Sequence, residues 1–199
     1  DKYDVKIIPQ KWGNCPWGFI EDHPDTWGFL TSYLLPSTNQ LPKQPDIWAQ
    51  VTVPNEFQRV GKYNIGFTAG METTRVAPQW VEGINRMDIN FVSSEHSKET
   101  FMQSRYEQKD QKTNQTVGIV QVEKPIEVLF EGVDLETYLP KKSEFDLNLI
   151  EENFAYLFVG HWMQGQIGED RKNVGGMIQC FFEAFKNKKK APALILKCS

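Results

Sequence analysis

Short apolar runs rich in β-branched and aromatic residues alternate along this chain with longer amphipathic or polar stretches. The alternation is typical of strands joined by crossover helices and not of strands joined by tight hairpin turns. The predicted strands lie at residues 5–8, 47–53, 64–68, 89–92, 126–130, 154–160 and 193–197. We therefore expect an α/β fold with a parallel sheet, which a structure of mainly antiparallel hairpins would contradict.

Three helices are signalled between these strands. Residues 78–87 have apolar side chains at helical spacing behind Pro78, a residue that suits a first helical turn. A second helix is expected to begin at Ser93 or Ser94, because serine is a preferred capping residue. A third is expected over residues 173–186, where phenylalanines and other apolar residues share one face.

The composition of the sequence changes near residue 140, where a polar stretch with a proline interrupts the strand pattern. We predict one domain over residues 1–140 and the start of a second over residues 141–199. Two strands and one helix cannot cover both faces of a parallel sheet, so the second domain is expected to be incomplete. A partner subunit or further chain is then expected to cover its apolar face and its free edge.

Composition excludes several classes of function. The net charge of −4 among 199 residues makes nucleic acid an unlikely partner. No apolar run reaches the roughly 18 to 20 residues that span a bilayer, and the first residues do not form a signal peptide. Cys15, Cys180 and Cys198 are odd in number and far apart, which predicts reduced thiols. These features predict a cytoplasmic protein, with peripheral membrane contact left open. The basic run at residues 186–190 is most simply explained as lysines at a helix C-terminus, where the negative end of the helix dipole favours positive charge.

The first candidate site follows the strand predicted at residues 154–160. A glycine at the carboxyl end of a parallel strand, opposite a helix N-terminus, lets a phosphate approach free backbone amides. Gly160 and His161 lie at this strand end, and Arg171 and Lys172 add positive charge where the next helix begins. A solvated loop is the alternative, and the P-loop pattern GxxxxGK[ST] is absent.

The second candidate site combines residues that follow two earlier strands. Glu72 comes after the strand at 64–68, where a carboxylate could accept hydrogen bonds from sugar hydroxyls or could cap the next helix. Ser94, Glu95 and His96 follow the strand at 89–92 and allow the same two interpretations. His96 is a candidate general base or hydrogen-bond donor, or a plain surface residue. No paired cysteines, HExxH motif or Ser-His-Asp order indicates a metal enzyme or a hydrolase.

The chain resembles a known enzyme family over about residues 47–197. The resemblance rests on ordered segments and not on one motif: FTAGMETTRVAPQWVE, NRMD, FVSSEHSK, VLFEGVD, YLFVG and EDRKN. These segments are similar to the Rossmann-like domains of GT-B glycosyltransferases of the family 4 type. The first four resemble the N-terminal, acceptor-side domain, and the last two resemble the opening of the nucleotide-sugar domain.

The resemblance implies a hexosyltransferase that moves a sugar, with retention, from a nucleotide sugar to an acceptor held between two Rossmann-like domains. Lys172 matches the family's diphosphate-binding lysine, whereas His161 stands where the family often has an arginine, whose charge Arg171 could supply. The acceptor (glycan, lipid, protein or other) is not identified, and no metal or other cofactor is expected. The family's first strand with its glycine-rich loop and its paired C-terminal glutamates have no counterpart here, which implies truncation at both ends. The alternatives are a non-catalytic binding or structural module and a nucleotide-binding domain of another α/β enzyme.

Overall fold

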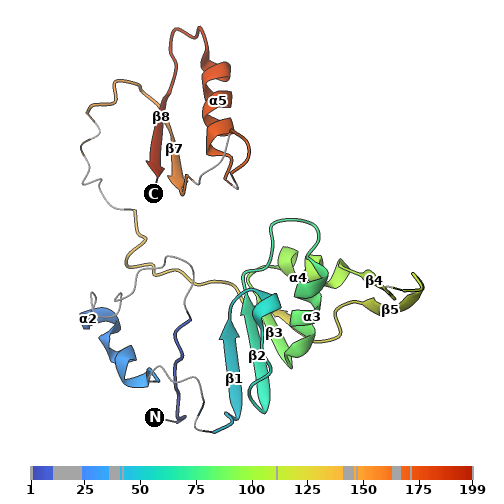
Figure 1. Ribbon diagram of the computed structural model, residues 1–199. Coiled ribbons are helices and arrows are strands. Elements are labelled where there is room, and N and C mark those ends of the chain that lie inside the picture. Colours follow the sequence, from blue (N-terminus) through green and yellow to red (C-terminus); the bar gives the residue numbers. More distant parts are fainter. Residues whose placement is uncertain are drawn as a thin grey trace. The chain divides into compact units, whose positions relative to one another are not determined.

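The computed structural model describes residues 2–10, 24–35, 41, 43–110, 112–140, 146, 148–162, 167–170 and 172–198. The chain divides into two compact units, Asp1–Val133 and Asp134–Ser199, which we call unit 1 and unit 2 (Figure 1). Each unit is described by itself. The assignment of the two units to an acceptor side and a donor side remains a prediction.

Unit 1 is built on a four-stranded, fully parallel sheet. Its order is β1-β2-β3-β6, with β1 at Ile47–Val51, β2 at Tyr63–Thr68, β3 at Ile89–Val92 and β6 at Ile126–Val128. The parallel α/β sheet expected from the apolar runs is therefore confirmed, and each of these strands starts within one residue of its predicted position.

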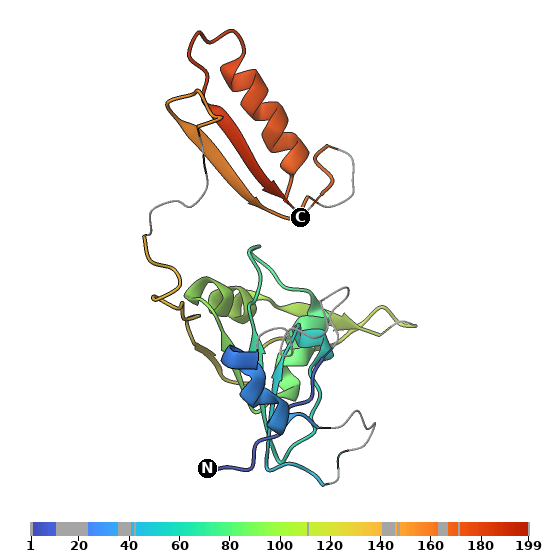
Figure 2. The ribbon, with the colours of Figure 1, turned by 90° about the vertical axis from the view of Figure 1, so that its left-hand side faces the viewer.

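The helices of unit 1 lie on one face of this sheet. Strand order follows chain order, so right-handed crossovers all pass over the same face. They contain the short 3₁₀ helix η2 (Pro54–Glu56), α3 (Pro78–Arg86) and α4 (Glu95–Gln103), and Figures 1 and 2 show α3 and α4 on the same side. The core is packed between the helices and the sheet, from Phe57, Val76, Val81, Ile84, Met87, Val92, Phe101 and Ile126.

The opposite face of the sheet presents apolar side chains that are partly exposed. Successive strand residues point to opposite faces, so Ile47, Val51 and Tyr63 lie away from the helices. Ile47 and Val51 are 60% and 62% exposed. On the same face the rings of Phe67 and Phe91 stack with their centroids 5.1 Å apart.

A partly buried polar network joins the amino ends of β2 and β3. The Asp88 carboxylate accepts hydrogen bonds from the backbone N–H of Asn64 at 2.8 Å and from its side-chain amide at 3.1 Å. The Arg59 guanidinium lies 3.0 Å from the other carboxylate oxygen. These contacts lower the pKa of Asp88: the Asn64 side-chain hydrogen bond contributes most, followed by the Asn64 backbone N–H.

The Asp88 network predicts a pH-dependent contribution to stability. Because the folded pKa is lowered, the contribution is complete above the unfolded carboxyl value of about 3.9 and is lost as the pH falls through the folded value. Asp88→Asn keeps a hydrogen-bond acceptor but does not ionise. We expect the urea midpoint of this variant to fall less between pH 6 and pH 3 than the wild-type midpoint does. An unchanged pH dependence in the variant would remove this role from Asp88.

Two parts of unit 1 differ from the sequence-based expectations. An antiparallel hairpin, β4 (Tyr106–Lys109) and β5 (Thr116–Val120), is inserted between α4 and β6 and was not predicted. The predicted strand at residues 5–8 is wrong. Ile7 forms only an isolated parallel bridge with Leu34, next to the short helices α2 (Pro24–Trp27) and η1 (Gly28–Tyr33).

Unit 2 consists of β7 (Ala155–Gly160), α5 (Val174–Phe185) and β8 (Ala193–Cys198), and its two strands are parallel. Tyr156 lies on the helix side, where its ring is 6.2 Å from that of Phe181 and 6.1 Å from that of Phe185, centroid to centroid. Leu157, on the opposite face, is 66% exposed. An exposed apolar face is what the short βαβ pattern predicts, and a partner that covers it remains a prediction.

Candidate functional site

The candidate site of unit 1 is a hollow at the carboxyl ends of three adjacent strands. It has a volume of about 410 Å³. The loop after β2, the start of α4 after β3 and the segment after β6 all contribute to it. Its lining consists of Ala69, Gly70, Met71, Glu72, Ser93, Ser94, His96, Ser97 and Glu131. This edge of a parallel sheet is where α/β proteins bind ligands most often.

Hydrogen bonds from the α4 end hold the loop after β2 in place. The hydroxyls of Ser93 and Ser97 both donate to the carbonyl oxygen of Ala69, at 2.9 and 3.2 Å. Further along the loop, the carbonyl oxygen of Thr73 lies 3.2 Å from His96 Nε2 and accepts from the Thr100 hydroxyl at 3.3 Å. The wall of the hollow is therefore fixed by side chains and not by loop packing alone.

Gly70 lets the loop approach α4 closely. Its φ is +82°, a left-handed conformation that other residues rarely adopt. A Cβ at this position would lie 2.3 Å from Ser97 Oγ and 2.5 Å from Ser97 Cβ. A side chain here would therefore push the loop away from the helix and alter the hollow.

The first turn of α4 forms part of the lining of the hollow. Ser94 caps the helix, and its hydroxyl accepts from the backbone N–H of Ser97 at 3.1 Å, which confirms the predicted helix start. The positive end of the helix dipole thus lies beside the carboxylates of Glu72 and Glu131. Hydroxyls, carboxylates and an imidazole can all exchange hydrogen bonds with a ligand that carries several hydroxyl groups.

The structure brings together three of the four residues predicted on this side. Glu72 and His96 both line the hollow, whereas Glu95, the first residue of α4, is exposed and does not line it. Ser94, which follows the same strand as His96, also lines the hollow as expected, whereas Ser93, Ser97 and Glu131 were not predicted. Glu131 could have been found, because carboxyl ends of neighbouring parallel strands meet at one edge and it follows directly after the run at 126–130.

The second candidate site lies at the carboxyl end of β7 in unit 2. Gly160 is the last residue of this strand, and His161 follows it and is exposed. A Cβ on Gly160 would lie 3.0 Å from the ring of Phe158, so the glycine leaves room for that ring. Lys172 is exposed two residues before α5, and Arg171 lies outside the described residues.

A carboxylate of the protein already occupies the N-terminus of α5. Asp170 is 8% exposed, and its two oxygens accept from the backbone N–H groups of Lys172 at 3.0 Å and Val174 at 3.2 Å. Asn173, the capping position, has a φ of +48° and makes no side-chain capping bond. Asp170 thus accepts from one amide at the start of the helix, and the binding of a phosphate at this strand end stays a prediction. Asp170 also places a negative charge beside Lys172.

Comparisons with protein families, with curated proteins and with solved structures find no significant match to this chain. Within the described part of the chain, no group of three or more His, Cys, Asp or Glu side chains is arranged to hold a metal ion. No helix in the same residues is long and apolar enough to cross a membrane. The geometry of the two strand-end sites is thus the basis for a functional proposal.

Proposed function

We propose that this chain is a sugar transferase, or part of one, that takes its sugar from a nucleotide-activated donor. The observation that carries the proposal is the polar hollow of unit 1. It combines hydroxyls, two carboxylates and an imidazole at the carboxyl edge of a parallel sheet. This chemistry suits a polyhydroxylated acceptor, because each of its hydroxyls can donate to a carboxylate or to a serine oxygen.

The proposed donor side is the carboxyl end of β7. Cationic groups there would favour the departing diphosphate, and positioning and electrostatics would provide the rate enhancement. Lys172 is the described cation at the start of α5, and His161 is the neighbouring imidazole at the strand end. Retention of configuration follows from the family resemblance alone and belongs to the same proposal.

Asp170 favours a second candidate function, a non-catalytic binding or structural module. Its carboxylate accepts from the amides of Lys172 and Val174, as an anionic ligand at a helix N-terminus would. When a side chain of the protein already accepts from these backbone amides, fewer N–H groups are left to bind a diphosphate. The two candidates differ in whether nucleoside diphosphates bind.

Titration calorimetry of UDP, GDP and ADP against the full chain distinguishes them. If the proposal holds, one diphosphate binds and Lys172→Ala weakens its binding about ten- to a hundredfold. A charge-assisted hydrogen bond is worth roughly 1.5 to 3 kcal/mol. His161→Ala is expected to have a smaller effect, because an ordinary imidazole is mostly neutral at pH 7.

Lys188→Ala is the matched control, because it removes the same charge from the other end of α5. Its affinity for the diphosphate is expected to equal that of the wild type. Equal losses in Lys172→Ala and His161→Ala would assign His161 the role of the family's arginine. Failure of the wild type to bind any of the three diphosphates would reject the transferase and support the non-catalytic module.

A further inference from the structure

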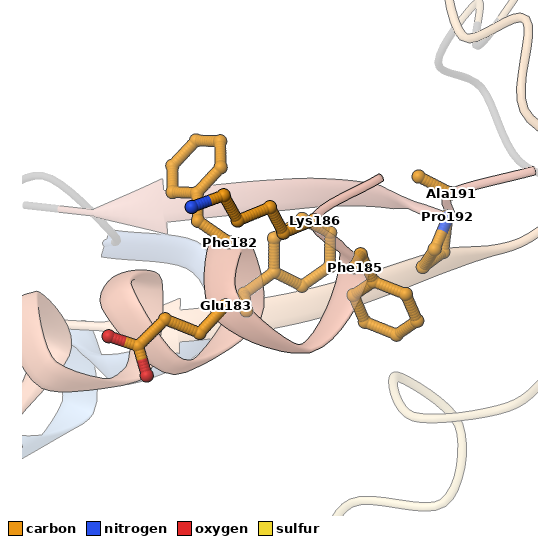
Figure 3. A pocket seen from close by; sticks show the side chains of 7 residues that line it. Phe182, Glu183, Phe185, Lys186, Ala191 and Pro192 are labelled. Atoms are coloured by element: carbon orange, nitrogen blue, oxygen red, sulfur yellow. The ribbon is translucent and has the colours of Figure 1, made fainter. Parts of the chain in front are cut away.

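Unit 2 has a second hollow, at the C-terminal end of α5. It has a volume of about 530 Å³ and an apolar lining that includes Phe181, Phe182, Phe185 and Pro192. Lys186 and Glu183 border it (Figure 3). Phe182 is 68% exposed, so a large aromatic side chain projects into solvent at this end of the helix.

Four lysines immediately follow this apolar surface. Lys186, Lys188, Lys189 and Lys190 lie in the connection between α5 and β8, and all four are exposed. None of the ion pairs between described residues involves any of them. A helix C-terminus carries only about half a negative charge, so the helix dipole accounts for one of these cations and not for four.

Phe182 and Lys186 lie together, and the other three lysines follow them closely in the chain. Phe182 and Lys186 are four residues apart, a spacing that places helical side chains on the same face. Figure 3 shows Phe182 in the last turn of α5 and Lys186 directly after the helix, with Phe185 beside Pro192. We call Phe182, Lys186 and the lysines at 188–190 the aromatic-basic surface.

We propose that the aromatic-basic surface docks on a lipid bilayer that contains anionic lipids. Lysine clusters beside exposed aromatic residues are attracted by anionic headgroups, while the ring enters the interface between headgroups and acyl chains. All cations of this surface are lysines. Lysine is a flexible point charge that suits a fluid layer of headgroups, whereas fixed carboxylates of a peptide are better matched by the planar fork of arginine.

A bilayer at the aromatic-basic surface is compatible with a diphosphate at the other end of unit 2. Helix α5 has 12 residues, so its ends are about 18 Å apart at 1.5 Å per residue. A bilayer at the C-terminal end would leave Lys172 and the carboxyl end of β7 accessible. The docking proposal does not depend on the transferase proposal, because it uses different residues and a different ligand.

Flotation of the full chain with vesicles tests the proposal. We expect binding to phosphatidylcholine vesicles that contain phosphatidylserine, and little binding to phosphatidylcholine alone. Lys188→Gln combined with Lys189→Gln should lower the partition coefficient roughly thirtyfold, from about fivefold for each lysine near an anionic surface. Phe182→Ser should lower it roughly tenfold, because an apolar side chain no longer leaves water.

Lys109→Gln combined with Lys112→Gln is the matched control, because it removes the same charge from the hairpin region of unit 1. This control should bind vesicles as the wild type does. Equal losses in both double variants, or no wild-type binding to the anionic vesicles, would overturn the proposal. Saturable binding of poly-glutamate but not of vesicles, lost in the Lys188/Lys189 variant, would also overturn it and assign the surface to an acidic polypeptide.

Discussion

Gly83→Ala is expected to destabilise unit 1 by about 3 kcal/mol or more, because overpacking against a backbone that cannot move aside is among the costliest changes in a core. Gly83 is buried in α3, where the helix crosses η2. A Cβ there would lie 1.8 Å from the carbonyl oxygen of Pro54 and 2.4 Å from its carbonyl carbon. Alanine improves helix propensity by about 1 kcal/mol, which does not offset a clash with two backbone atoms.

Neighbouring hydrogen bonds prevent α3 from simply moving away. Arg86, in the last turn of α3, donates from Nε to the carbonyl oxygen of Phe57 at 2.7 Å and from Nη2 to that of Asn55 at 2.8 Å. Relieving the clash would stretch both bonds. Urea unfolding of Gly83→Ala should therefore show a lower midpoint, and soluble protein should be hard to obtain.

Gly132→Ala is the control, because nothing lies within 4 Å of the Cβ it would add. Its free energy of unfolding should change by less than about 0.5 kcal/mol. A Gly83→Ala protein with the wild-type midpoint would show that α3 and η2 do not pack as closely as described.

Asn64→Ala is expected to cost about 2 to 6 kcal/mol, because each of two buried N–H groups that loses its acceptor costs about 1 to 3 kcal/mol. Asn64 is fully buried, and its Oδ1 accepts from the backbone N–H of Val60 at 2.9 Å and from that of Gly61 at 2.8 Å. Its amide donates to the carbonyl oxygen of Gly61 and to Asp88. The Asn64 side chain thus satisfies backbone groups of Val60 and Gly61 in the loop before β2.

Asn55→Ala is the corresponding control, since Asn55 is exposed and only its backbone carbonyl takes part in a hydrogen bond with Arg86. Its unfolding midpoint should match that of the wild type. If Asn64→Ala unfolds at the wild-type midpoint as well, the Asn64 hydrogen bonds contribute no net stability.

Strands were predictable where a run of apolar residues crosses the buried sheet. Residues 64–68 and 89–92 combine β-branched or aromatic side chains with flanking turn residues, and the structure contains β2 and β3 there. Strand β4 was not predictable from apolar runs, because it is mostly exposed and polar, whereas the β-branched run TVGIV of β5 could have been recognised. The strand predicted at residues 5–8 was wrong for the opposite reason. The run has strand propensity, but among the described residues it pairs with another segment only through the single bridge at Ile7.

The site was predictable as far as it depends on strand ends. Glu72 and His96 follow predicted strands, and parallel pairing then brings them to one edge. Two features depend instead on tertiary contacts that no local pattern reveals. Ser97 turns its hydroxyl back to Ala69, and Asp170 folds its carboxylate over the start of α5.

The order of strands in unit 1 has a consequence for biosynthesis. After β1, each of β2, β3 and β6 pairs with the strand that precedes it in this series, so no strand has to be inserted between two others. Such a sheet can grow at one edge while the chain emerges from the ribosome, because each new strand finds its neighbour already formed. Paired residues lie 16, 24 and 36 positions apart in β1–β2, β2–β3 and β3–β6, so each successive pairing closes a longer loop and loses more chain entropy than the one before it.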